Sequence, residues 1–169
     1  MSITTRAGTS KDLNDVLALN QANQPHLSGL TSDELQSIVQ QAALFSVVEL
    51  DRQFAGFVFG LLPDADYGSE NLAWFKRQYQ NFFYVDRIAI ADHAQGQGCG
   101  SVLYREVENY CREKNIAQIA LEVNTRPLNQ NSLDFHRHQG YNEVGTQETG
   151  GGTKTVSLMM KSLKGASKN

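Results

Sequence analysis

The stretch Gln95-Gly96-Gln97-Gly98-Cys99-Gly100-Ser101 decides the fold, because its three alternating glycines separate a strand pattern from a helix pattern. The run before it, residues 82–90 (FFYVDRIAI), is apolar and rich in strand formers, and residues 102–112 (VLYREVENYCR) place apolar side chains at helical spacing. Glycine lets the backbone come close to a ligand and adopt positive φ. The first N–H groups of a helix attract negative charge. The stretch therefore predicts an anion cradle, with a pyrophosphate as the expected ligand.

Two common phosphate motifs fit this loop poorly. A P-loop is excluded, because it requires a lysine before the position of Ser101, where the chain has Gly100. A dinucleotide-binding loop requires Gly-x-Gly-x-x-Gly, and here Gly96 and Gly98 fit but Ser101 occupies the third position. Because Glu122 lies at the end of a later strand pattern, where that motif places its acidic residue, the dinucleotide interpretation is weakened but stays open. A tight glycine turn without a ligand is a further alternative.

Composition bounds the class of protein. The chain has 169 residues and a formal charge of −3, with no cluster of basic residues, so we expect one domain and no nucleic-acid partner. The two cysteines, Cys99 and Cys111, form no Cys-x-x-Cys pair, and the four histidines lack zinc-site spacing, so we expect free thiols and no metal. No run resembles a signal peptide or a membrane span. These patterns predict a cytoplasmic protein that does not bind a membrane.

The periodicity predicts an α+β fold with mixed layers rather than a doubly wound sheet, because hairpins dominate the first half and the end of the chain. We expect a single domain over residues 1–163 and a flexible tail over residues 164–169, within a polar stretch that begins at Leu163. The expected strands cover residues 3–7, 44–50, 53–61, 82–90, 116–123, a segment starting at 141, and 154–160. The first expected helix is capped by Thr9 or Ser10, and the other expected helices cover residues 31–41, 71–79, 98–114 and 129–139.

Two motifs, in matching elements, resemble the GCN5-related N-acetyltransferases. Gln95-x-x-Gly98-x-Gly100 has the spacing of that family's acetyl-CoA loop, Gln/Arg-x-x-Gly-x-Gly/Ala. The segment from Asn129 to Tyr141 is similar to a second family pattern, with Asn129, Ser132 and the Gly140-Tyr141 pair in matching places. The chain departs from the pattern at His136, where the family usually has tyrosine. The resemblance covers nearly the whole chain and implies a mostly antiparallel central sheet flanked by helices.

The resemblance implies an N-acetyltransferase that moves an acetyl group from acetyl-CoA to a primary amine of a small molecule or a protein by direct attack. It also implies which residues contact the co-substrate. The backbone of Ile88, Ala89 and Ile90 would pair with the pantetheine arm, and Asn129 and Phe135 would contact the same molecule. The pyrophosphate would lie on Gln95, Gly96, Gln97, Gly98, Cys99, Gly100 and Ser101. The alternative function is a non-catalytic sensor that binds an acyl-CoA or a dinucleotide.

Three residues are catalytic candidates. Asp86, within an apolar strand, is either a general base or a structural partner of Arg6, Arg87 or another cation. For Glu122 we expect a solvated strand end, with a second base or a ligand of the amine as the alternative. The resemblance implies that the tyrosine usually found at the position of His136 protonates the departing thiolate. His136 either replaces this tyrosine as the acid or only positions the co-substrate.

The other candidates have structural interpretations. Arg87 is expected in a structural ion pair, and Cys99 is expected as a small residue in a tight loop rather than a nucleophile. The aromatic residues of segment 71–79 form either a lid or a cover for the sheet. The acceptor pocket is expected between residues 23–30 and residues 63–80, which carry no recognisable acceptor signature. A homodimer is compatible with the family.

Overall fold

The computed structural model describes residues 1–163, and their strands form one seven-stranded sheet in the order β1-β2-β3-β4-β5-β7-β6. The strands are β1 (Ile3–Ala7), β2 (Leu44–Leu50), β3 (Gln53–Leu61), β4 (Phe82–Ile90), β5 (Gln118–Arg126), β6 (Asn142–Thr149) and β7 (Lys154–Ser162). The helices are α1 (Leu13–Ala22), α2 (Ser32–Gln41), α3 (Glu70–Gln78), α4 (Cys99–Glu113) and α5 (Gln130–His138), with short 3₁₀ turns at Ser10–Asp12 and Asp92–Ala94. The α+β fold, with a mostly antiparallel sheet and flanking helices, is confirmed.

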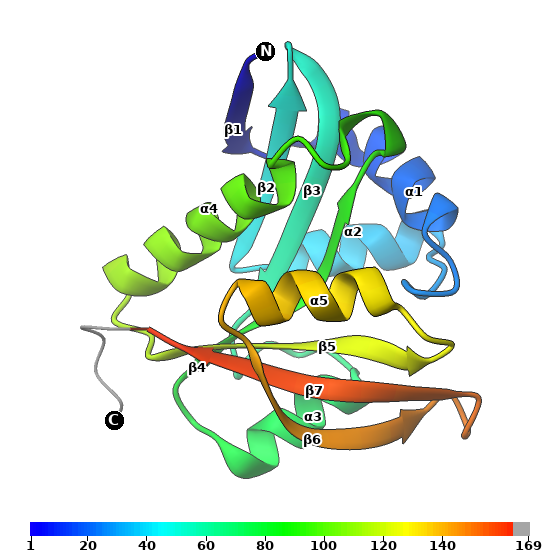
Figure 1. Ribbon diagram of the computed structural model, residues 1–169, viewed down its shortest axis with the longest axis vertical. Helices are drawn as coiled ribbons and strands as arrows, with labels where there is room; N and C mark the ends of the chain where they lie inside the picture. The colour runs from blue at the N-terminus through cyan, green and yellow to red at the C-terminus, as the bar shows by residue number, and fades with distance from the viewer. Residues whose placement is uncertain (164–169) are drawn as a thin grey trace.

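The sheet opens between its two central strands. β4 and β5 run parallel, and they pair over only three positions, from Phe82 opposite Gln118 to Tyr84 opposite Ala120. Beyond this short ladder the strands diverge, so β1 to β4 form one half of the sheet and β5, β7 and β6 cross them as the other half (Figure 1). Backbone groups of β4 after Tyr84 therefore face a gap instead of a neighbouring strand.

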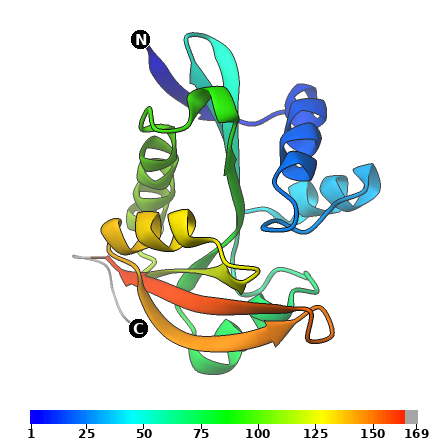
Figure 2. The same ribbon diagram turned by 45° about the vertical axis from the view of Figure 1, so that its right-hand side comes forward.

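Helices cover both faces of this opened sheet. In Figure 2, α4 and α5 lie on one side and α1 and α2 on the other. Leu103 and Leu133 pack in the core under α4 and α5, whereas Val16 and Ile38 pack against the β3 side chains under α1 and α2. Phe75 of α3 packs in a third core cluster with side chains of β4, β5 and β7. Apolar burial on each face fixes the two halves around the gap.

Local sequence signals set the helix starts. Thr31 and Glu34 form a capping box at α2, with the Glu34 amide donating to the Thr31 hydroxyl and the Glu34 carboxylate accepting from the Thr31 amide. α4 begins differently, because Gly98 before it has φ of +94° and no capping side chain. The first N–H groups of any helix have no intrahelical acceptors, and at α4 no capping side chain replaces them.

Most expected boundaries lie within two residues of the observed ones, and two differences affect the core and the site. β5 continues to Arg126, whereas the sequence pattern predicted a loop from residue 124, because β7 pairs with β5 through this segment. Leu163 was expected in a polar tail, but its side chain is buried in the core and its amide donates to the Ala117 carbonyl. The predicted tail, residues 164–169, lies outside the described residues. None of the helices within residues 1–163 is long and apolar enough to cross a membrane.

Candidate active site

A cavity of about 380 Å³ lies where β4 and β5 diverge. Side chains from both faces of the sheet line it: Tyr104, Asn129, Ser132 and His136 come from the side of α4 and α5, and residues of the α1–α2 connection, the segment before α3 and the β6–β7 hairpin come from the other side. The cavity therefore extends through the gap in the sheet, from one face to the other. Such a passage suits a reaction between two substrates that enter from opposite faces.

The glycine loop leaves open space at the start of α4, where an anion could bind. Gly96 and Gly98 have φ of +74° and +94°, and a Cβ on either would meet no atom within 4 Å. The α4 amides that follow are unpaired within the helix and point out of its end. Gln95 holds the approach to this loop, because its side-chain amide donates to the Ile90 carbonyl at 3.2 Å. The residues present thus fit a pyrophosphate group.

The remaining predicted co-substrate residues lie along the same side. Ile88, Ala89 and Ile90 pair with β3 on one edge, and their other edge borders the gap. Asn129 caps α5 without a side-chain bond to that helix and lines the cavity. The Phe135 ring lies 3.2 Å from a Cβ built on Gly100, so it packs closely on the first turn of α4. Ser101 accepts a hydrogen bond from the Gln139 amide at 3.1 Å.

Glu122 lies in the middle of β5, and its side chain lines the cavity. The expectation that Glu122 ends its strand in solvent was therefore wrong. The Tyr84 hydroxyl lies 2.9 and 2.8 Å from its two oxygens. Burial, with the charge of Asp86 nearby, raises the pKa of Glu122 to about 8, although hydrogen bonds from Tyr84 and Asn71 oppose this shift. A carboxylate with this pKa exchanges protons near neutral pH, which is the property that a general base needs.

Asp86 forms a buried ion pair at the cavity wall. Its Oδ2 lies 2.9 Å from Arg87 Nε, and both side chains are nearly inaccessible to solvent. The Tyr67 hydroxyl donates to the same oxygen at 3.2 Å. Arg87 reaches further, to Asn20 Oδ1 at 2.9 Å and to the Ser28 carbonyl at 3.2 Å. The predicted structural ion pair of Arg87 is confirmed, and its partner is Asp86.

His136 lies on the cavity wall formed by α4 and α5, in contact with Tyr104. Its Nδ1 lies 2.7 Å from the Ser132 carbonyl, which can only accept, so Nδ1 carries the proton. Nε2 is then an acceptor, and the Tyr104 hydroxyl donates to it at 2.6 Å. Burial lowers the pKa of His136, outweighing the bond to Ser132. The ring is therefore neutral at neutral pH.

Several other candidates are excluded by their surroundings. Cys99 is buried at the start of α4, and burial raises the pKa of its thiol, which disfavours the thiolate. Phe75 is fully buried, and Trp74 packs beside it, so the aromatic residues of α3 cover the sheet rather than form a lid. Within residues 1–163, no group of three or more His, Cys, Asp or Glu side chains is placed to hold a metal ion.

Sequence reasoning missed the tyrosines of the site. Tyr84 and Tyr104 sit among apolar residues at strand and helix spacing, so the pattern did not single them out as site residues. Tyr67 lies in a connection without periodicity. The sequence signal that could have found them is a tyrosine at a core position. A buried tyrosine hydroxyl usually has a polar partner, so such a residue indicates a second polar group nearby.

The family comparison agrees with this geometry. The model of the family described as "Acetyltransferase (GNAT) family" matches residues 14–141, which include the glycine loop and most of the cavity wall. A comparison with curated protein sequences found no match.

Solved structures with the same fold cover the whole length of the chain. The ribosomal-protein-S18-alanine N-acetyltransferase from Escherichia coli superposes with a TM-score of 0.75 at 16% identity, covering 99% of this chain and 98% of that one. Ard1 from Thermoplasma volcanium gives 0.78 at 18% identity, covering 96% and 99%. Arabidopsis thaliana Naa50, solved with the bisubstrate analogue CoA-Ac-MVNAL, gives 0.73 at 17% identity, covering 96% and 100%. At these identities the similarity shows the fold alone.

Proposed function

The chain belongs to the acetyltransferase (GNAT) family, and from that premise we propose that it transfers the acetyl group of acetyl-CoA to a primary amine, with Glu122 as the general base. Family membership implies acetyl-CoA as co-substrate and an amine as acceptor. The observation that carries the assignment of the base is the position of Glu122, which lines the cavity where β4 and β5 diverge and is held there by Tyr84.

Glu122 would accept the proton that the ammonium group of the acceptor must lose before attack. The amine nitrogen then forms a bond to the carbonyl carbon of the thioester, giving a tetrahedral oxyanion. The carbon–sulfur bond breaks as this intermediate collapses, and the second proton of the nitrogen passes to solvent, which in turn protonates the departing thiolate. Tyr84 holds the carboxylate in place through its hydroxyl, and Asp86 is held in an ion pair with Arg87. Of the two carboxylates proposed from the sequence, Glu122 therefore fits the base better than Asp86.

The co-substrate side supplies binding and charge stabilisation. A backbone N–H of β4 between Ile88 and Ile90 would stabilise the oxyanion, because this edge faces the gap. Gln95 to Ser101 would bind the pyrophosphate, and Asn129 and Phe135 would border the pantetheine arm. His136, neutral and accepting from Tyr104, would shape this wall rather than protonate the thiolate, which leaves with help from solvent.

The substitution His136→Phe tests this secondary role. We expect kcat to fall by only roughly tenfold, well short of the loss of a general acid, and the alkaline limb of the pH–rate profile to stay in place. A variant carrying both His136→Phe and Tyr104→Phe avoids leaving a buried hydroxyl unpaired, so it separates packing from proton transfer. Disappearance of the alkaline limb in both variants would make His136 the acid.

A sensor without chemistry is the rival function, and binding and turnover distinguish the two. Acetyl-CoA should raise the melting temperature, because it binds the folded state, and NAD should not. With an amine present, the enzyme should release CoA thiol continuously. Stabilisation by NAD but not by acetyl-CoA would contradict the proposed function.

A further inference from the structure

Three segments that are distant in sequence surround the acceptor side of the cavity. They are the α1–α2 connection (residues 23–30), the segment that leads into α3 (residues 67–71) and the β6–β7 hairpin (residues 147–154), and each contributes residues to the cavity wall. We name these three segments the acceptor collar. Their mutual contacts decide whether the acceptor enters through a closed rim or along an open groove.

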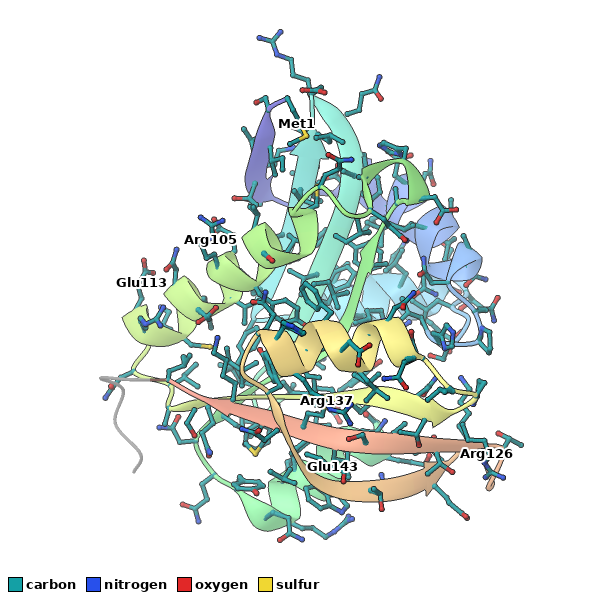
Figure 3. The ribbon with its side chains drawn as sticks, in the orientation of Figure 1. Met1, Arg105, Glu113, Arg126, Arg137 and Glu143 are labelled. Atoms are coloured by element: carbon teal, nitrogen blue, oxygen red, sulfur yellow. The ribbon has the colours of Figure 1, made fainter. Side chains whose placement is uncertain are left out.

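The α1–α2 connection is bound to the hairpin strand and to β5. Lys154 Nζ donates to the Pro25 carbonyl at 2.8 Å. The Asn124 amide lies 3.3 Å from the carbonyls of both Pro25 and His26. The hairpin is fixed in turn to β5, since Arg126 Nη2 donates to the Gly152 carbonyl at 2.6 Å, and Figure 3 places Arg126 beside the hairpin turn.

The hairpin is also bound to the start of α3. The Gly150 amide donates to Glu70 Oε2 at 3.3 Å. The Gln147 amide donates to Asn71 Oδ1 at 3.1 Å and lies 3.3 Å from the Glu70 carbonyl. These hydrogen bonds close the collar between the β6–β7 hairpin and the start of α3.

The last side closes through the buried ion pair. Tyr67 donates to Asp86, Asp86 pairs with Arg87, and Arg87 donates to the Ser28 carbonyl. Arg87 also holds Asn20, which is fully buried, so this link is anchored in the core. The collar is therefore a closed circuit of contacts around the acceptor side.

A closed rim restricts how an acceptor can enter. A polypeptide substrate that lies across a site is held mainly by hydrogen bonds to exposed main-chain groups. Here the Pro25 and Glu70 carbonyls and the Gly150 amide already have hydrogen-bond partners within the collar, and the Ser28 carbonyl accepts from Arg87 of β4. The rim therefore offers few free main-chain groups to a polypeptide, and the whole cavity, with a volume of about 380 Å³ that both substrates must share, lies in the range of small-molecule sites.

We propose that the acceptor is the primary amine of a small molecule rather than an amino group of a polypeptide. This inference rests on the proposed acetyl transfer and specifies its acceptor. The collar contacts, with Lys154 as the link between the α1–α2 connection and the hairpin, act as the device that excludes a polypeptide.

Three acceptor classes distinguish the possibilities with wild-type protein and acetyl-CoA. They are a panel of small amines (a diamine, an amino alcohol, an amino sugar and an amino-acid amide), tetrapeptides with a free α-amino group, and α-N-acetylated peptides with one lysine. We expect kcat/KM for the best small amine to exceed that for either peptide class by roughly a hundredfold or more. A peptide that exceeds every small amine would overturn this inference and leave the proposed function standing. No transfer to any class, with acetyl-CoA bound, would overturn both.

A collar variant tests the device itself. Lys154→Met removes the link to Pro25 and should raise kcat/KM for the peptides by roughly tenfold, without changing the affinity for acetyl-CoA. Lys161→Met is the matched control, because Lys161 lies on the same strand but pairs with Glu108 at 3.2 Å, away from the cavity. We expect Lys161→Met to leave kcat/KM unchanged for both the peptides and the small amines. An unchanged ratio of peptide to small-amine rates in Lys154→Met would show that the collar does not select the acceptor.

Discussion

Glu122→Gln is expected to lower kcat by on the order of a hundredfold or more while leaving acetyl-CoA affinity nearly unchanged. The amide keeps the shape of the side chain and its contact with Tyr84, but it cannot accept the proton of the ammonium group. In the wild type the carboxylate must be ionised to act, so kcat should rise with pH through the pKa of about 8. Steady-state kinetics over this range, with binding of acetyl-CoA measured by calorimetry, checks the prediction.

Stability provides the control for this variant. The pKa of Glu122 in the folded state, about 8, lies above the ordinary value of 4.5, so the stability associated with its protonated form is lost as pH rises between these values. Gln carries no charge, so at about pH 9 the variant should melt at a higher temperature than the wild type. Lower activity together with higher stability excludes unfolding as the cause. Equal melting temperatures and normal kcat would remove Glu122 from the mechanism.

Asp86→Asn is the matched comparison. The change weakens the partner of a buried Arg87, so we expect a lower melting temperature and a loosened α1–α2 connection. Turnover should fall less than in Glu122→Gln when both are measured below their melting temperatures. The reverse order of the two kcat values would assign the base to Asp86.

Gly98→Val should abolish measurable binding of acetyl-CoA in a protein that stays folded. Gly98 has φ of +94°, which a β-branched residue rarely adopts, so the loop must rearrange to accept the side chain. No atom lies within 4 Å of the new Cβ, so the substitution does not clash with the protein itself. The added side chain instead occupies the space in front of the α4 amides, where the pyrophosphate is proposed to lie.

Gly151→Val separates backbone strain from the loss of the anion site. Gly151 also has positive φ, +66°, and open space around its Cβ position, but it lies in the β6–β7 turn. Both variants should lose comparable stability, whereas only Gly98→Val should lose calorimetric binding of acetyl-CoA. Wild-type affinity in Gly98→Val would place the pyrophosphate elsewhere.

The sequence predicted the strands and helices well where local signals are strong. The glycine loop between 82–90 and the following helix, and the capping box at Thr31, depend on neighbouring residues, so their positions could be inferred from spacing. The extension of β5 to Arg126 could not be inferred, because it depends on pairing with β7, about thirty residues away in the chain. Leu163 was misassigned for the same reason, because its amide donates to the carbonyl of Ala117, which is distant in the sequence.

The site was less accessible to sequence reasoning than the fold. Glu122 ended an apolar run, and nothing local showed that the strand continues or that Tyr84 would meet its carboxylate. The roles of Asp86 and Arg87 depend on Asn20 and Ser28, which approach them only through the folding of α1 over the sheet. Likewise, the tautomer of His136 follows from Ser132 on its own helix and Tyr104 on another, and only the first of these is a local contact.

The central claim is acetyl transfer with Glu122 as the base, and the most direct test measures both products at once. Wild-type protein is incubated with acetyl-CoA and the amine panel, CoA thiol is followed by a thiol reagent, and the acetylated amine is quantified by mass spectrometry. We predict one acetylated amine for each thiol released, at a rate that rises through about pH 8 and is lost in Glu122→Gln. Saturable binding of acetyl-CoA with no acetylated amine at any pH would contradict the account and identify a binding module.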